Sequence, residues 1–239
     1  MRNRFGWKML LSINLVALVL IILLSIVGSK TITVIAEKQM PASSKYIIID
    51  AGHGGVDGGA TSCSGVLESK INLEIALRLD DLLHLLGMQT IMIRTEDISI
   101  HTEGETIASK KVSDLKNRAG IINQTYNAVL VSIHQNYFYD QRYSGAQVFY
   151  ANTAGSADLA QKMQTQFVAT LNPGSNRRIK KASGIYLMEN IKCPGILIEC
   201  GFLSNPQEEA KLLSDRYQKD ICCVIASILS SYAQANAVT

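Results

Sequence analysis

Short runs of β-branched residues alternate with helical patterns over most of the chain, and this alternation is the strongest constraint on its fold. The runs occupy residues 46–50, 90–94, 128–133, 146–150, 185–188 and 195–199. The helical patterns occupy residues 69–86, 112–124, 156–170 and 207–233. Strands that alternate with helices form mostly parallel sheets with helices on both faces. The sequence therefore predicts a single α/β domain with a central, mostly parallel sheet flanked by helices.

The first helical pattern has one continuous apolar stripe. Ile71, Ile75 and Leu79 recur at helical spacing, and Gly87 marks the end of the helix. Glu68 falls on the same stripe when each residue turns by about 100°. We therefore expect its carboxylate to point toward the sheet.

The N-terminus contains a segment of 19 residues without charge, residues 9–27. As a helix it would cross about 30 Å of hydrocarbon. Arg2, Arg4 and Lys8 precede it, a distribution that favours a cytoplasmic tail and export of the remainder. A cleaved signal peptide is the alternative, but its apolar region usually has only about 7–15 residues. We therefore favour an uncleaved membrane anchor.

These observations divide the chain into three predicted parts. Residues 1–36 form a membrane anchor or signal segment, residues 37–44 form a linker, and residues 45–236 form the folded domain. Whether the N-terminal segment is an uncleaved anchor or a cleaved signal peptide, we expect the folded domain to act outside the cytoplasm, anchored to the membrane or secreted.

The charge balance gives no indication of nucleic-acid binding. The chain has 23 Lys and Arg against 20 Asp and Glu, a net charge of +3. Four of the basic residues lie within residues 1–30, which contain no acid, so the rest of the chain is almost neutral. A nucleic-acid partner is therefore not expected.

Five cysteines are present, and none forms a CxxC pair. An odd number without that spacing indicates neither a zinc ribbon nor a closed disulfide framework. We expect Cys200, Cys222 and Cys223 to be buried as small apolar residues. The sequence also allows a disulfide between Cys63 and Cys193.

Polar side chains stand where buried strands end. His53 follows the first strand, His134 follows the third, and Glu199 closes the last. Glu68 begins the first helix, at the end nearest the loop of His53. The carboxyl ends of strands border the ligand crevice in open α/β sheets, so we expect the four side chains to converge.

Two imidazoles and one carboxylate with an open fourth position are typical of catalytic zinc. The sequence predicts that His53, Glu68 and His134 hold Zn²⁺, which activates a water molecule. Glu199 would accept the proton of that water and pass it to the leaving amine. The alternative for each residue is structural, as a hydrogen-bonded histidine or a salt-bridged carboxylate.

Two further motifs have weaker interpretations. The glycine-rich residues 52–60 lack the third glycine of a dinucleotide fingerprint, and no GK[ST] follows, so a cofactor phosphate is not expected. The basic run of Arg177, Arg178, Lys180 and Lys181 is most simply a solvated loop. Attraction of the carboxylates of an acidic substrate is the alternative.

Four separated segments together resemble one enzyme family. The segments IIIDAGHGGVDGGA, LESKINLEIALRL, VSIHQN and PGILIECGFLSNPQE, which lie between Lys45 and Tyr232, resemble the zinc-dependent N-acetylmuramoyl-L-alanine amidases of bacterial cell walls. The resemblance implies a single α/β catalytic domain. It also implies zinc ligands at His53, Glu68 and His134, and a catalytic carboxylate at Glu199.

The resemblance implies a reaction and partners. Members of the family hydrolyse the amide between the lactyl group of N-acetylmuramic acid and L-alanine of the peptidoglycan stem peptide. The N-terminal segment and the bare catalytic domain most resemble the sporulation and germination subgroup, which removes stem peptides from spore cortex before muramic δ-lactam forms. Besides peptidoglycan, the membrane and an accessory protein for targeting or activation are expected partners.

Two other functions stay open from the sequence. One is a peptidoglycan-binding or regulatory module without turnover, and the other is a zinc peptidase that cuts within the stem peptide.

Overall fold

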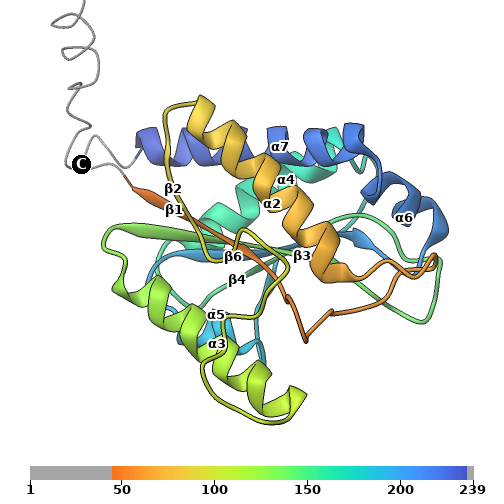
Figure 1. Cartoon of the computed structure of the whole chain (residues 1–239). Helices are drawn as coiled ribbons and strands as arrows, with labels where there is room; N and C mark the ends of the chain where they lie inside the picture. Colours follow the sequence, from red (N-terminus) through yellow and green to blue (C-terminus); the bar gives the residue numbers. More distant parts are fainter. Residues whose placement is uncertain (1–44, 236–239) are drawn as a thin grey trace, which may run out of the picture. The chain divides into compact units, whose positions relative to one another are not determined.

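The computed structural model describes residues 45–235, in which six strands form one sheet (Figure 1). The order across the sheet is β2-β1-β3-β6-β4-β5. The strands are β1 (Tyr46–Ala51), β2 (Gln89–Met92), β3 (Ala128–Asn136), β4 (Gln147–Tyr150), β5 (Lys180–Lys181) and β6 (Gly195–Phe202). Strands β2, β1, β3 and β6 run parallel, whereas β4 is antiparallel to β6. The predicted α/β domain with a mostly parallel sheet is therefore confirmed.

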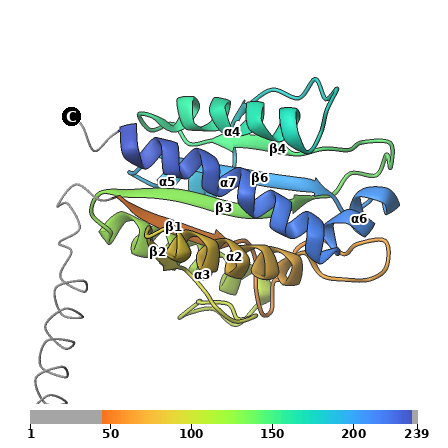
Figure 2. The ribbon, with the colours of Figure 1, turned by 90° about the horizontal axis from the view of Figure 1, so that it is seen from above.

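Helices cover both faces of the sheet. Helices α2 (Glu68–Leu85), α4 (Ser156–Thr170) and α7 (Asp215–Ala235) lie on one face, and α3 (Ile107–Gln124) and α5 (Tyr186–Asn190) lie on the other (Figures 1 and 2). The short helix α6 (Pro206–Leu212) follows β6.

Alternation along the strands separates two apolar cores. Ile47 and Ile49 of β1 pack in the core under α2, α4 and α7, while Ile48 packs in the core under α3 and α5. This period of two is the one that a strand covered on both faces requires. The sheet edge that carries the polar strand ends is thus fixed by apolar packing on either side.

The strand predicted at residues 185–188 is wrong, because this segment forms α5. Gly184 precedes it with a φ of 77°, a left-handed conformation that turns the chain out of an extended path. Leu187 and Met188 are consecutive and both buried. A strand would send these neighbours to opposite faces, whereas a single helical turn packs both near α3.

Residues 207–233 do not form one helix as predicted, since α6 ends before α7 begins. Asn205 caps α6 by accepting hydrogen bonds from the backbone of Gln207 and Glu208. Ser214 then starts α7, its hydroxyl accepting from the backbone N–H of Tyr217 at 3.3 Å. A serine that offers the backbone this alternative partner interrupts an otherwise continuous apolar pattern.

Two other boundaries differ from the prediction. Helix α3 begins at Ile107 rather than at residue 112, because Thr106 and Ser109 form a reciprocal capping box. The two-residue strand β5 lies within the basic run that was interpreted as a solvated loop.

The cysteines are free thiols, so the disulfide between Cys63 and Cys193 is not formed. Cys200 and Cys222 are buried as predicted, but Cys223 is exposed.

The predicted anchor and linker, residues 1–44, lie outside the described residues. Within residues 45–235, none of the helices combines the length and apolar character that crossing a membrane requires.

Candidate active site

The four predicted side chains meet at the carboxyl edge of the sheet. His53 lies two residues beyond the end of β1, and Glu68 is the first residue of α2. His134 and Glu199 lie on the neighbouring strands β3 and β6 and are direct partners in their register. Parallel strands that end at one edge bring together residues that are far apart in the sequence.

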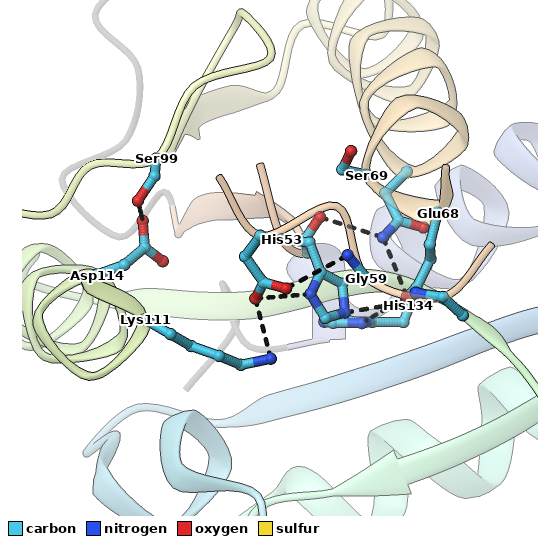
Figure 3. Close-up of polar contacts among 12 residues, drawn as sticks. His53, Gly59, Glu68, Ser69, Ser99, Lys111, Asp114 and His134 are labelled. Carbon is cyan, nitrogen blue, oxygen red and sulfur yellow. Dashed lines mark hydrogen bonds and ion pairs between the residues drawn. The ribbon is translucent and has the colours of Figure 1, made fainter. Parts of the chain in front are cut away.

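Three of these side chains form a compact cluster. One ligand atom from each of His53, Glu68 and His134 lies within 4.8 Å of the other two. The Nε2 atom of His53 is 3.3 Å from Oε2 of Glu68, and Nδ1 of His134 is 3.0 Å from Oε1 (Figure 3). The donor set of two imidazoles and one carboxylate fits zinc.

Glu68 is buried and holds its charge through hydrogen bonds. The backbone N–H of Ala60 donates to Oε2 at 3.0 Å, and that of Gln135 donates to Oε1 at 3.1 Å. Burial acts to raise the pKa of Glu68, but hydrogen bonds and attraction from the two histidines outweigh it and hold the pKa well below its usual range. The carboxylate is therefore ionised and fixed toward both imidazoles.

Asp57 and Lys111 orient His53 from the other side of its ring. Oδ2 of Asp57 accepts a hydrogen bond from Nδ1 at 2.9 Å, and Nζ of Lys111 contacts the same oxygen at 2.9 Å (Figure 3). With Nδ1 bonded to Asp57, Nε2 is the ring nitrogen directed into the cluster, where a metal ion would take the place of its proton. This is the usual outer partner of a metal-binding histidine.

The two carboxylates also set the charge preference of the cluster. Burial acts to lower the pKa of His53, but hydrogen bonds with Asp57 and Glu68 outweigh it and raise that pKa to about 9. The surroundings of this imidazole therefore favour positive charge, as expected around a cation site.

No role for Asp57 was predicted from the sequence. An acid four residues after a candidate ligand histidine, in the same glycine-rich loop, was the signal available for it.

Two buried arginines hold the backbone beneath His53. Arg118 donates to the carbonyls of Ala51 at 2.9 Å and His53 at 2.7 Å. Arg94 donates to the carbonyls of Ala51 and Gly52. Asp50 and Asp114 pair with Arg118, so its charge is compensated within the protein. The sequence pattern did not reveal this network, because β1, the loop of His53 and the segment after β2 reach Arg118 or Arg94 only in the folded chain.

Gly52, which directly follows β1, lies so close to His134 that no side chain fits there. A Cβ atom at this position would lie 2.2 Å from Cε1 of His134. Glycine therefore lets β1 pass directly against the second imidazole.

Glu199 stands beside the cluster without joining it. Its Oε2 atom is buried and has no hydrogen-bond partner among the described residues. Burial raises the pKa of Glu199 to about 7. A carboxyl group with that pKa can accept and return a proton near neutral pH.

A cavity of about 280 Å³ opens over the two histidines. Lys111 and Leu115 of α3 line one side, and Tyr186 and Leu187 of α5 line another. Its polar floor and partly apolar walls are typical of a small-molecule or peptide site.

An α/β domain with this cluster at the carboxyl edge of its strands has the arrangement of a metal-dependent hydrolase. Residues 47–231 match the family model of the N-acetylmuramoyl-L-alanine amidases. The chain belongs to this family and is a peptidoglycan amidase.

Relatives support the assignment in sequence and in structure. The chain is 39% identical over 189 residues to the germination-specific N-acetylmuramoyl-L-alanine amidase of Bacillus subtilis (strain 168), covering 78% of this chain and 79% of the relative. It is 37% identical to the CwlD amidase of Clostridioides difficile, solved in complex with the GerS lipoprotein. That match has a TM-score of 0.77 and covers 80% of this chain and 100% of the other. An N-acetylmuramoyl-L-alanine amidase from Clostridium difficile 630 is 32% identical, with a TM-score of 0.70 and coverage of 81% and 98%.

Proposed function

We propose that the protein uses zinc, held by His53, Glu68 and His134, to hydrolyse the amide between the lactyl group of N-acetylmuramic acid and L-alanine of the stem peptide. The observation that carries this proposal is the three-residue cluster, whose ligand atoms lie within 4.8 Å of one another, with the unpartnered Glu199 beside it. A structural role would leave no reason for a buried carboxyl oxygen without a hydrogen bond at this place.

Each residue has a distinct part in the reaction. When bound, zinc supplies Lewis acidity that activates a water molecule and polarises the scissile carbonyl. Glu199 accepts the proton of the attacking water and delivers it to the leaving nitrogen of L-alanine. Asp57 holds His53 in the tautomer that directs Nε2 inward, and Glu68 remains ionised because the two histidines stabilise its charge.

The relatives support a more specific setting for the reaction. Similarity to a germination-specific amidase favours spore cortex as the substrate and muramic δ-lactam formation as the consequence. The complex of CwlD with a lipoprotein favours an accessory protein as a partner of this chain too. We further propose that residues 1–36 form an N-terminal anchor or signal segment, residues 37–44 a linker, and residues 45–236 an extracytoplasmic catalytic domain.

The reaction is tested by incubating the full-length protein with purified muropeptides and zinc, followed by mass spectrometry. An amidase releases a stem peptide that begins with intact L-alanine and leaves a lactyl carboxylate. Fragments cut within the stem would instead indicate a peptidase, and binding without product would indicate a regulatory module.

The variant Glu199→Gln tests the proton-transfer role in the same assay. We expect a loss of about 10²–10⁴-fold in rate, because the amide cannot take up the proton. Glu105→Gln, which changes an exposed carboxylate, is the matched control. Release that survives Glu199→Gln at full rate, or that a chelator does not affect, would contradict the mechanism.

A further inference from the structure

A second cavity lies one strand beyond Glu199. On β6, Glu199 pairs in register with His134 on one side and with Gln147 of β4 on the other. Gln147 lines a shallow, open cavity of about 630 Å³, which Arg177, Arg178 and Lys180 also line. Adjacent strands are about 4.8 Å apart, so this basic cavity begins one strand away from the proposed proton-transfer group.

Both sites open on the same face of the sheet. Leu197, two residues before Glu199, and Phe149, two residues after Gln147, both pack in the core under α3 and α5. Because side chains alternate along a strand, Glu199 and Gln147 point to that same face. The basic cavity therefore lies on the side of Glu199 that faces away from His134, within reach of a peptide that extends across β6.

Arg177 is held in one orientation by several contacts. Its guanidinium lies 4.7 Å from the ring centroid of Phe202 and 6.0 Å from that of Tyr143. Its Nε atom donates to the carbonyl of Ser144 at 2.8 Å, and a terminal nitrogen reaches Oε1 of Gln147 at 3.4 Å. Stacking and these hydrogen bonds order the side chain before any ligand arrives.

Of the four basic residues that line this cavity, only Arg142 has a carboxylate partner within residues 45–235. Within residues 45–235, no salt bridge joins an acid to Arg177, Arg178 or Lys180. The nearby Asp140 pairs with Arg142. Glu208 contacts Lys211 at 3.4 Å and accepts from the backbone of Gly145 at 2.7 Å. The half-buried guanidinium of Arg177 is thus partly removed from water without a direct salt bridge, and only the more distant charge of Glu208 attracts it. A bound carboxylate would offset the remaining cost of burial.

We infer that the cavity around Arg177 binds carboxylate groups of the stem peptide, beyond the amide that is cut. The inference rests on the proposed function for the identity of the substrate. The planar fork of arginine matches a carboxylate in a bidentate manner, and Arg178 and Lys180 add positive charge at the rim. The basic run is therefore a determinant of substrate specificity, and the interpretation as a solvated loop does not account for the ordered, unpaired Arg177.

The test compares two forms of one stem peptide, with its carboxylates free or amidated. Binding of each form to the full-length protein is measured by calorimetry, which requires no turnover. We expect wild type to bind the free-carboxylate form about tenfold or more tightly, the usual gain for a hydrogen bond to a charged partner. Arg177→Gln should abolish this preference without affecting the amidated form.

A second variant and a control separate recognition from folding. The double variant Arg178→Gln/Lys180→Gln alters exposed side chains and should weaken the same preference in part. Arg216→Gln, on α7 and 87% exposed in its side chain, should leave it unchanged. In kinetics with intact muropeptide, Arg177→Gln should raise KM for the free-carboxylate form with little change in kcat.

The outcomes are distinct from those that test the amidase reaction. A preference that depends on Arg177 supports the cavity even if no amide is cut. Equal binding of the two peptide forms by wild type would overturn the inference even if the amidase is fully active. An equal loss for both forms in Arg177→Gln would also overturn it, because it would show a general structural role.

Discussion

Arg118 of α3 donates a hydrogen bond to the backbone carbonyl of His53 at 2.7 Å, which joins the helix layer directly to the loop of a candidate metal ligand. The same guanidinium pairs with Asp50 at the end of β1. His53 has a φ of 62°, a conformation that non-glycine residues rarely adopt. Such a conformation persists only where surrounding contacts hold it in place. The hydrogen bond from Arg118 is such a contact for His53.

Replacing Arg118 should destabilise the whole domain. Arg118→Ala leaves the buried carboxylate of Asp50 without its ion pair, and breaking a buried pair in this way costs about 3–5 kcal/mol. The free energy of unfolding, measured by urea titration at neutral pH, checks the value. Arg216→Ala, which removes an exposed ion pair on α7, should cost less than about 1 kcal/mol. Equal effects of the two substitutions would show that the network contributes little.

Asp50 should make part of the stability dependent on pH. Its burial acts to raise the pKa, but Arg118 and a hydrogen bond from Ser132 outweigh burial and lower it. A carboxyl group whose pKa is lower in the folded state stabilises the protein at pH values above its unfolded-state pKa, which is about 3.9 for Asp. This contribution is lost as the pH falls through the folded-state pKa.

Unfolding titrations of wild type and Asp50→Asn between neutral pH and acid isolate this contribution. The difference in free energy of unfolding between them should be largest near neutral pH and should shrink on acidification below about pH 4. A difference that stays constant over this range would contradict the assignment to Asp50.

Asp57 should control metal affinity without binding the metal itself. Asp57→Asn weakens the partner of Nδ1 in His53, and loss of such an outer contact typically costs about 10–100-fold in metal affinity. Zinc affinity measured by competition with a chromogenic chelator checks this expectation. Asp81→Asn, an exposed change on α2, is the control. Unchanged affinity in Asp57→Asn would mean that Lys111 and the loop backbone alone orient the ring.

The sequence predicted those parts of the fold that depend on long periodic patterns. The alternation of strands and helices and the inward face of Glu68 follow from local periodicity, and the structure has both. It failed where a single polar group decides the local structure, as Ser214 does between α6 and α7. It also failed at α5, where five residues are too few to show a period.

The candidate site divides in the same way. His53, His134 and Glu199 could be named because each directly follows or ends an apolar strand. Arg118 and Arg177 could not be assigned roles. Apart from Asp114, which lies one turn from Arg118 on α3, their partners come from distant segments and backbone carbonyls, which leave no trace in local spacing.

The most direct test of the account is the zinc content of the full-length protein, compared between wild type, His53→Ala and His84→Ala after equilibration with zinc and gel filtration. His84 is an exposed histidine on α2, 57% exposed in its side chain, and serves as the matched control. The account predicts about one zinc ion per chain in wild type and in His84→Ala. It predicts little zinc in His53→Ala, because the two remaining ligands are too few to hold the ion. Equal zinc content in all three proteins, or none in wild type, would contradict it.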